Sequence, residues 1–292
     1  MAWENIISVD SRNKSAAAWL AIIRRWSLIG LAGLFALIMV FPLFWLVSGS
    51  IKLPGTLLTY PPTLIPEAYT FDNFRVLFQR GIPFQTFFFN SVVVSAFHVG
   101  GAVFLSSMMG YALAKYDFPG KKLLFGLILL GMLIPIQVLV IPMFLVVRDL
   151  GFTNTRTALV LPFIAHPLGA FLFRQYMLGV PDSVIESGRI EGASEFRIFG
   201  QLFAPMVVPA FAAFAVVDFV NVWNGFIWPL VVVRDQSKFV LPVWLNTLIQ
   251  DPYLQNNAML FAASLLTVIP AVLLFIFFQR QFVSGFSATS EK

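Results

Sequence analysis

The chain has 292 residues, of which 59% are hydrophobic and only 11% are charged, and its mean hydropathy is +0.84. A soluble domain typically carries about 25% charged residues, so this composition excludes an ordinary soluble protein and predicts an integral membrane protein. The basic residues behind the net charge of +5 are spread over short connecting segments, so nucleic acid is not an expected partner, and the lack of cysteine excludes disulfides and thiolate metal sites.

Six apolar segments are candidates for crossing a membrane, because a spanning helix needs roughly 20 apolar residues. The fifth carries one charge, at Asp218, and the others are free of Asp, Glu, Lys and Arg. The first follows Arg24 and Arg25 as a signal peptide would, but its apolar run over residues 27–47 is longer than a signal h-region of about 7 to 15 residues, which favours an anchor. The predicted spans are residues 26–51, 81–114, 123–147, 157–173, 206–233 and 252–279.

The distribution of lysine and arginine predicts the orientation, because cytoplasmic segments retain positive charge. Of the 19 basic residues, 12 fall on the side of the two termini and 7 on the other side, so we expect both termini in the cytoplasm. The expected cytoplasmic parts are an N-terminal segment (1–25), a large loop (about 178–205) and a C-terminal tail (281–292). The transmembrane domain covers residues 26–280, with external loops at about 52–83 and 234–257.

The large cytoplasmic loop contains a predicted helix start. Ser183 and Glu186 have the spacing of a capping box, in which each side chain bonds the other residue's backbone N–H. Gly188 and Gly192 are four residues apart and would lie on one helix face. Each glycine costs about 1 kcal/mol relative to alanine inside a helix, so two on one face indicate that something packs closely there.

Residues 186–205 resemble the coupling-loop signature of ABC importer permeases, which reads Glu-Ala-Ala, three residues, Gly, nine residues and then Ile-x-Leu-Pro. Glu186, Gly192 and Pro205 have the spacing of this signature. The departures exchange small for small or apolar for apolar residues, at Ser187, Gly188, Leu202 and Ala204.

Further motifs are similar to the carbohydrate branch of these permeases, typified by the MalG subunit of the maltose importer, and follow in order along nearly the whole chain. They are residues 71–74, 90–91, 110–115, 118–121, 150–155, 223–226 and 229–230. The resemblance implies an all-α membrane protein with six transmembrane helices in the ABC importer permease (MetI-like) fold, in the bacterial cytoplasmic (inner) membrane. It also implies a permease subunit for binding-protein-dependent import of a sugar, oligosaccharide or sugar derivative.

Several partners follow from this resemblance. The chain contains no G-x-x-x-x-G-K-[ST] phosphate loop, so we expect it to be non-catalytic and to bind no cofactor itself. The resemblance implies ATP and Mg on a homodimer of separate ATP-binding subunits, a second permease subunit that makes a heterodimer, an extracytoplasmic solute-binding protein and surrounding membrane lipid.

The same resemblance assigns residues to two of these contacts. Glu186 would pair with a basic residue of the ATPase, and the alternative is a role only as a helix cap. The full set expected to couple to the ATPase is Glu186, Ser187, Gly188, Gly192, Ala193 and Pro205. The second external loop is expected to meet the solute-binding protein, with candidate contacts at Trp244, Asn246, Gln250 and Tyr253.

Asp218 is the one acidic residue inside the predicted spans, and an ionisable group in a membrane is a functional candidate by default. With Asn221 and Asn224 at helical spacing, it is a candidate for the translocation path; the alternative is a structural contact between helices. His98 is expected to be a buried, hydrogen-bonded histidine, and His166 is expected to accompany a kink.

Two other functions are alternatives to transport by an ABC permease. An ion-coupled secondary transporter would act through Asp218 or His98, but such transporters show internal repeats, and no convincing repeat relates the two halves of this chain. A membrane-embedded enzyme would need paired carboxylates, a nucleophile with its base, or a metal ligand set, and the predicted spans contain none of these.

Overall fold

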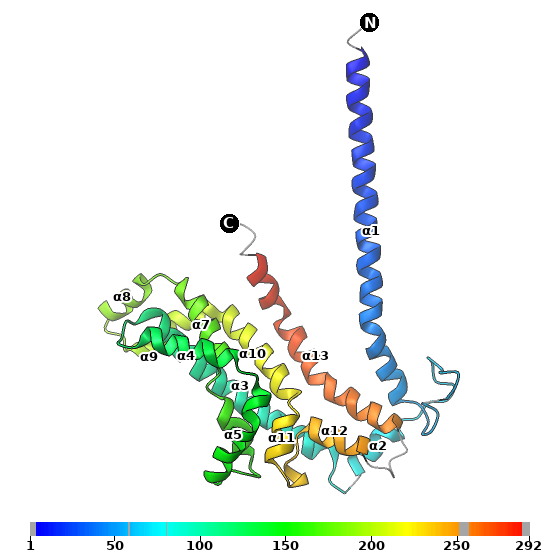
Figure 1. The fold of residues 1–292 in the computed structure, drawn as a ribbon. Coiled ribbons are helices and arrows are strands. Elements are labelled where there is room, and N and C mark those ends of the chain that lie inside the picture. Colours follow the sequence, from blue (N-terminus) through cyan, green and yellow to red (C-terminus); the bar gives the residue numbers. More distant parts are fainter. Residues whose placement is uncertain (1–3, 58, 80, 251–256, 288–292) are drawn as a thin grey trace.

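The computed structural model describes residues 4–57, 59–79, 81–250 and 257–287. In these ranges the chain is helical, and the only β-pairing within them is an isolated bridge between Lys52 and Tyr69. Figure 1 shows the elements, which are α1 Glu4–Ser50, α2 Asp72–Gln79, α3 Phe84–Lys115, α4 Lys121–Leu133, α5 Ile136–Asp149, α6 Arg156–Val160, η1 Leu161–Phe163, α7 Pro167–Leu178, α8 Ser183–Ile190, α9 Glu195–Arg197, η2 Ile198–Phe203, η3 Ala204–Val207, α10 Val208–Trp223, α11 Ile227–Val232, η4 Gln236–Lys238, α12 Leu241–Gln250 and α13 Asn257–Ser287.

The six predicted spans correspond to four continuous helical stretches and two bent pairs of helices. The continuous stretches that are long and apolar enough to cross a membrane are Ile22–Ser50, Phe84–Lys115, Glu195–Trp223 and Asn257–Gln279. The bent pairs are Lys121–Leu133 with Ile136–Asp149, and Arg156–Phe163 with Pro167–Leu178. If each bent pair is one span, the described chain has up to six, in agreement with the prediction.

The third predicted span is not a straight helix, and here the sequence-based expectation of one continuous segment is wrong. Its two halves differ in direction by 107°. Ile134 leaves the helix with φ −84° and ψ 118°, because the ring of Pro135 disfavours helical backbone at the residue before it. The fourth span bends by 43° before Pro167, where His166 is extended, so His166 accompanies a kink as predicted.

The fifth span was predicted at residues 206–233, but the helical stretch begins at Glu195 and ends at Trp223. Its first part is irregular, with a π-helical segment, η2, followed by a 3₁₀ turn, η3. Pro205 and Pro209 explain this irregularity, because neither can donate the backbone hydrogen bond that a regular α-helix requires. The helix therefore begins before the predicted apolar segment, and Pro205 lies within it.

The centre of the molecule is formed by α3, α7 and α10, which pack against one another. Small residues line the contact between α3 and α7, where Gly110 lies against Phe173 and Gly169 lies against Ser106. Larger residues such as Phe173 and Phe214 fill the space towards α10. Close approach over small residues is the usual way in which helices associate in lipid.

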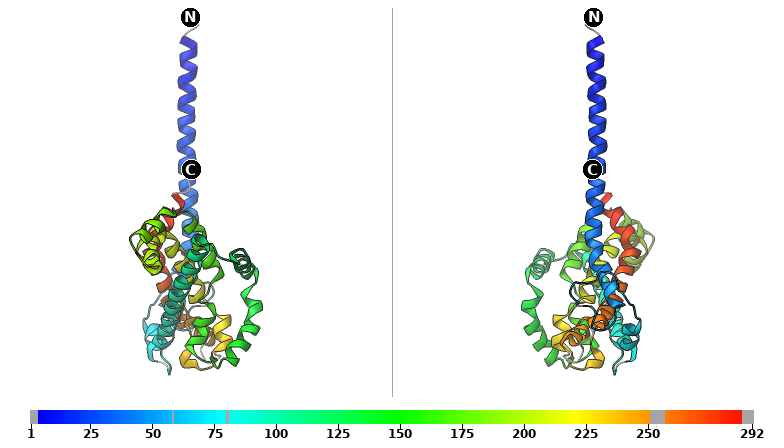
Figure 2. Two further views of the ribbon diagram at one scale, coloured as in Figure 1. Left: turned by 90° about the vertical axis from the view of Figure 1, so that its left-hand side faces the viewer. Right: turned by 90° about the vertical axis from the view of Figure 1, so that its right-hand side faces the viewer.

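The longest helix, α1, stands apart from this centre (Figures 1 and 2). Its contacts are with the first part of α13, where Gly49 lies against Phe261. The apolar side chains of its membrane-spanning part are uncovered by the rest of the chain; Leu37, for example, is 72% exposed. Such a surface requires lipid or another subunit.

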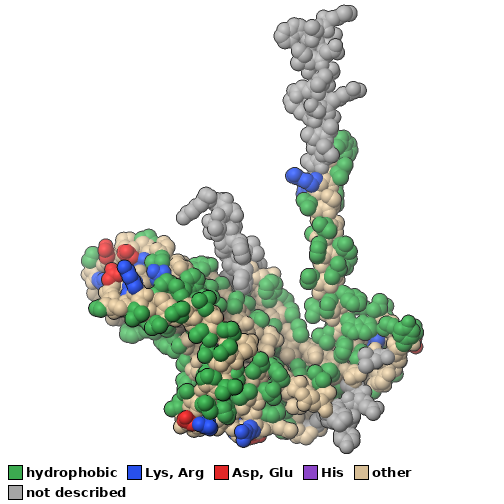
Figure 3. Space-filling view, in the orientation of Figure 1, with side chains coloured by type: hydrophobic (Ala, Val, Ile, Leu, Met, Phe, Trp, Pro, Cys, Tyr) green, Lys and Arg blue, Asp and Glu red, His purple; other side chains and the backbone are tan. Residues whose placement is uncertain are grey.

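Charges lie at the two ends of the molecule, with an apolar surface between them. In Figure 3, acidic and basic side chains gather over α8 and α9 and again at the opposite end, below α5 and α11. The N-terminal part of α1 and the C-terminal part of α13 extend to the side of α8, and α2 and α12 lie on the other side (Figure 1). This arrangement suits a membrane protein whose termini share one side.

Candidate functional site

The segment after the fourth span folds into a helical hairpin, residues 183–197, made of α8, a tight turn and α9. Gly192 forms the turn with φ +75°, a backbone conformation that favours glycine. Its N–H donates to the Arg189 carbonyl at 3.0 Å, and the Ala193 N–H donates to the Gly188 carbonyl at 2.9 Å. These two bonds make a Schellman motif, which ends α8 and reverses the chain.

Gly188 and Gly192 do not share a helix face, so that prediction is wrong: α8 ends at Ile190, two residues before Gly192. The close approach expected at Gly188 does exist, and its partner is the chain's own η2. A Cβ atom on Gly188 would lie 2.9 Å from both Ile198 Cγ1 and Leu202 Cδ1. Two of the departures from the coupling-loop signature, Gly188 and Leu202, therefore contact each other.

The predicted capping box is also absent. The helix begins at Ser183, and the cap position is Asp182, whose side chain makes no capping hydrogen bond. The Asp182 carbonyl instead accepts from the N–H groups of Ile185 and Glu186, at 2.9 and 3.1 Å, which starts the helix without side-chain help. The Glu186 side chain is exposed on the hairpin surface.

The outer surface of the hairpin combines charge with two large apolar side chains. Ile190 is 87% exposed and Phe196 is 73% exposed, and Glu186 and Glu191 of the same hairpin are also exposed. On the inner side, Ile185 and Ile198 are buried in the core. Ile190 and Phe196 are not among the predicted site residues, because neither belongs to the signature. Both are apolar residues within a polar loop, which is the signal that marks them.

Asp218 is buried inside the bundle, next to His98. Its Oδ1 lies 3.6 Å from Nε2 of His98, and both side chains are at most 5% exposed. The pair connects α10 to α3, and His98 also stacks on Phe163. The burial predicted for His98 is confirmed. The distance of 3.6 Å between its Nε2 and Asp218 Oδ1 is too long for a hydrogen bond. Among the described residues, His98 Nδ1, Asp218 Oδ2 and His166 Nδ1 are buried with no hydrogen-bond partner.

The three candidates for the translocation path do not form one site. Asp218 faces the interior of the bundle, whereas Asn221 and Asn224 are exposed on the surface of the chain. Asn224 ends α10, and its side-chain amide donates to the Val220 carbonyl at 2.9 Å. Asn221 and Asn224 can contact a neighbouring molecule, and Asp218 cannot in this conformation.

The candidate contacts for a solute-binding protein lie on or after α12. Trp244 is 7% exposed and stacks on Phe87 with ring centroids 4.8 Å apart, so its side chain packs the core. Asn246 is half-buried and Gln250 is exposed. Tyr253 lies outside the described residues.

Asn90 and Ser91 attach the segment before α12 to α3. The Asn90 amide donates to the carbonyls of Ser237 and Phe239 at 2.8 and 3.0 Å, and its Oδ1 accepts from Arg156. Ser91 Oγ accepts from the Leu241 N–H at 2.7 Å. One buried amide thus joins α3, α6 and the segment before α12.

We expect Asn90→Ala to loosen the segment of residues 234–241, because it leaves two carbonyls and Arg156 without their partner. Each unsatisfied buried group costs about 1–3 kcal/mol. Limited proteolysis of the detergent-solubilised protein measures this as faster cleavage within the segment. Gln250→Ala changes an exposed side chain at the end of α12 and is the control. This variant is expected to be cleaved like the wild type. Equal cleavage of all three proteins would contradict the assignment.

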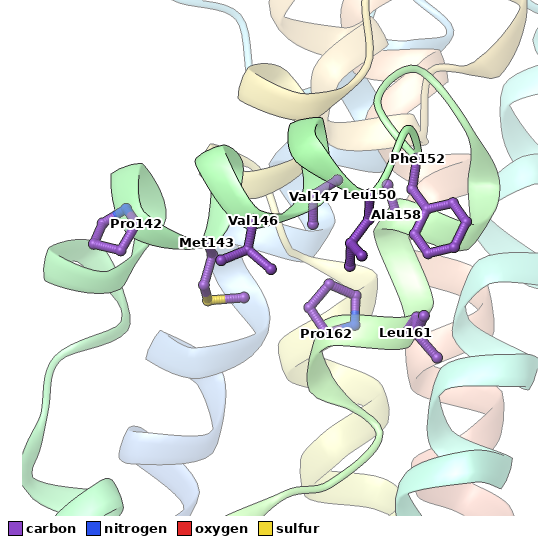
Figure 4. Close-up of a pocket in the computed structure, with 9 residues that line it drawn as sticks. All are labelled: Pro142, Met143, Val146, Val147, Leu150, Phe152, Ala158, Leu161 and Pro162. Carbon is purple, nitrogen blue, oxygen red and sulfur yellow. The ribbon is translucent and has the colours of Figure 1, made fainter.

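A pocket of about 400 Å³ lies between α5 and the α6–η1 segment (Figure 4). Its lining is apolar, with residues Pro142, Met143, Val146, Val147, Leu150, Phe152, Ala158, Leu161 and Pro162. A sugar needs hydrogen-bonding groups for its hydroxyls, and these side chains offer none. This pocket is therefore not a site for a sugar.

A family model described as "Binding-protein-dependent transport system inner membrane component" matches residues 102–287, which include the hairpin and Asp218. The chain belongs to this family. It is a multi-pass membrane permease, and the comparisons support this assignment over an ion-coupled transporter.

Relatives of this permease include AraQ of Bacillus subtilis (strain 168), named an arabinooligosaccharides transport system permease protein. The two are 39% identical over 261 residues, which cover 89% of this chain and 92% of AraQ. NgcG of Streptomyces coelicolor, a diacetylchitobiose uptake system permease protein, is 31% identical over 87% of this chain and 84% of its own. UgpE of Yersinia pestis, a sn-glycerol-3-phosphate transport system permease protein, is 31% identical over 85% of this chain and 91% of its own.

The permease fold is also found in a solved structure of a bacterial ABC transporter involved in the import of the acidic polysaccharide alginate. The TM-score is 0.77 at 24% sequence identity, over 88% of this chain and 96% of that chain. This likeness confirms the helical permease fold predicted from the sequence.

Proposed function

We propose that this chain is one of two permease subunits of an ATP-driven, binding-protein-dependent importer for a sugar, oligosaccharide or sugar derivative. The relatives named for arabinooligosaccharides and diacetylchitobiose support the substrate class. ATP and Mg belong to separate ATP-binding subunits, since the sequence contains no phosphate-binding loop. The observation that carries the proposal is the exposed surface of the hairpin, at the position of the coupling-loop signature.

The hairpin surface has the chemistry of a helix that docks in a groove. Ile190 and Phe196 supply apolar anchors, and Glu186 supplies an unpaired carboxylate beside them. Ser187 lies next to Glu186 on the exposed side. Gly188 and Gly192 act differently, since they shape the hairpin: the first permits close packing on η2, and the second makes the turn.

The substrate path would lie between this chain and a second, different permease subunit. Asn221 supports this, because its amide is exposed on α10 within the apolar stretch Glu195–Trp223, and Asn224 is exposed at the end of the same helix. An amide without a partner in hydrocarbon is costly, so a polar neighbour or water is expected there. The external end near Asn246 and Gln250 would meet the solute-binding protein, and both termini would lie in the cytoplasm.

The contact with the ATPase is tested by reversing the charge of Glu186. When the affinity-tagged Glu186→Lys variant is isolated from its native membranes, the amount of co-purifying ATPase, measured by mass spectrometry, is expected to fall about tenfold or more. Removing one partner of a charge pair at an interface costs about 2–5 kcal/mol. Glu67→Lys makes the same charge change on an exposed acid outside the hairpin, in the loop before α2, and is expected to retain the ATPase. Wild-type recovery with Glu186→Lys would refute the contact.

A further inference from the structure

Lys115, the last residue of α3, is buried against the segment that leads into the hairpin, residues 180–182. Its side chain is 4% exposed, and Nζ donates to the Val180 carbonyl at 2.5 Å. The same ammonium pairs with Asp182 Oδ1 at 2.7 Å and lies 5.7 Å from the ring centre of Phe203 in η2. Burying an ammonium is costly unless it is paired and hydrogen-bonded, so these contacts hold the start of the hairpin against α3.

Tyr116, the next residue, reaches the other end of the hairpin. Its hydroxyl donates to the Glu195 carboxylate, whose Oε1 accepts from Arg189 Nε at 2.7 Å. The Arg189 guanidinium also lies 5.6 Å from the ring centre of Tyr116. Burial raises the pKa of Tyr116, so the hydroxyl keeps its proton and remains a donor. One aromatic side chain therefore touches both Arg189, in α8, and Glu195, in α9.

The helix that carries these two residues is the central one of the bundle. It packs against α7 and α10, pairs His98 with Asp218, and holds the external segment through Asn90. Tyr111, one turn before Lys115, continues the contact through the rings of Phe199 and Phe203 in η2, with centroids 5.2 and 4.8 Å away. A displacement of the hairpin therefore acts on α3 directly.

We propose that Lys115 and Tyr116 are positioning residues that tie the hairpin to α3, so that movement of the docked hairpin is transferred to this transmembrane helix. The inference rests on the proposed function, because it takes the hairpin as the site of ATPase docking. It assigns a separate role to residues that lie outside the hairpin and outside the coupling-loop signature. Lys115 and Tyr116 transmit the movement, while Glu186 and its exposed neighbours make the contact.

The test uses the assembled complex in lipid nanodiscs and needs no knowledge of the sugar. The chain has no cysteine, so spin labels are placed at two exposed positions, Phe97→Cys on α3 and Phe277→Cys on α13. The distance between the labels is measured before and after trapping with MgATP and vanadate. We expect the distance to change in the otherwise wild-type chain, and Lys115→Met and Tyr116→Phe to lose most of this change while trapping as much nucleotide.

Two further variants separate tethering from a general need for charge. Lys115→Arg keeps the cation and is expected to retain the distance change. Lys121→Met removes a lysine whose salt bridge is local, to Asp117 four residues before it, and is expected to behave as wild type. If Lys115→Met fails to insert, Tyr116→Phe carries the test, because it removes a single oxygen atom.

A full distance change in both Lys115→Met and Tyr116→Phe would overturn the proposal, as would the absence of any change in the wild type. Loss of the change in Lys121→Met as well would also overturn it, since the effect would then not depend on these contacts. Failure of the proposed function gives a different result: no ATPase and no trapped nucleotide would accompany the wild-type chain.

Discussion

Replacing Gly188 by leucine is expected to abolish ATP-driven transport while the chain remains in the membrane. Even a Cβ atom at this position would lie 2.9 Å from Ile198 and Leu202, and Ile198 is fully buried. The leucine must push α8 away from η2, since overpacking a buried contact costs about 1–3 kcal/mol. Membrane insertion, measured by membrane fractionation, is expected to be normal, and recovery of the co-purifying ATPase is expected to fall about tenfold, as a cost of 1.4 kcal/mol implies.

The second site of this contact offers a compensating change. Leu202→Ala removes the side chain whose Cδ1 faces Gly188, so the double variant Gly188→Leu with Leu202→Ala is expected to recover part of the ATPase. A Gly188→Leu protein with wild-type recovery would show that α8 does not rest on η2.

Gly192 is the matched comparison, because its surroundings are open and its backbone is left-handed. Asparagine tolerates this backbone conformation better than leucine does. Gly192→Asn is therefore expected to retain more of the ATPase than Gly192→Leu. The harm in the leucine variant would come from strain in the turn, in addition to any obstruction of docking.

Replacing His98 by leucine is expected to destabilise the transmembrane bundle. It leaves the Asp218 carboxylate buried, with neither oxygen bound to a partner among the described residues. A buried polar group left without a partner typically costs about 1–3 kcal/mol, above the roughly 0.6 kcal/mol average for a hydrogen bond between membrane helices. Thermal unfolding in detergent measures this loss as a lower Tm, by several degrees.

The double variant His98→Leu with Asp218→Val distinguishes the cost of an unpartnered buried Asp218 from the cost of lost packing. Apolar residues in place of both partners are often neutral for stability, so the Tm is expected to rise again towards the wild-type value. Asn221→Leu, one turn further along α10 and exposed, is the control and is expected to unfold like the wild type. If the double variant were less stable than His98→Leu alone, the unpartnered Asp218 side chain could not be the cause of the destabilisation.

Much of the fold could be predicted because its causes are local. An apolar segment long enough to span lipid has few alternatives to a helix, since its backbone groups must bond within the segment. The break in the third span has a local cause, the proline that follows Ile134. A hydropathy average does not detect it, because the proline lies within an apolar segment. The helix of the fifth span begins before the predicted apolar segment, because it continues through the charged residues Glu195 and Arg197, which a hydropathy criterion leaves out.

The candidate site shows the same division. By itself, the sequence determined that the chain is a membrane protein, from its composition, and that it resembles ABC importer permeases, from motifs such as the spacing of Glu186, Gly192 and Pro205. Only the tertiary structure decided that Gly188 faces Leu202, that Asp218 turns inward to His98 while Asn221 turns outward, and that Lys115 holds the hairpin. These are contacts between residues far apart in the chain, and they depend on how each helix is rotated and where it is broken, which no local spacing specifies.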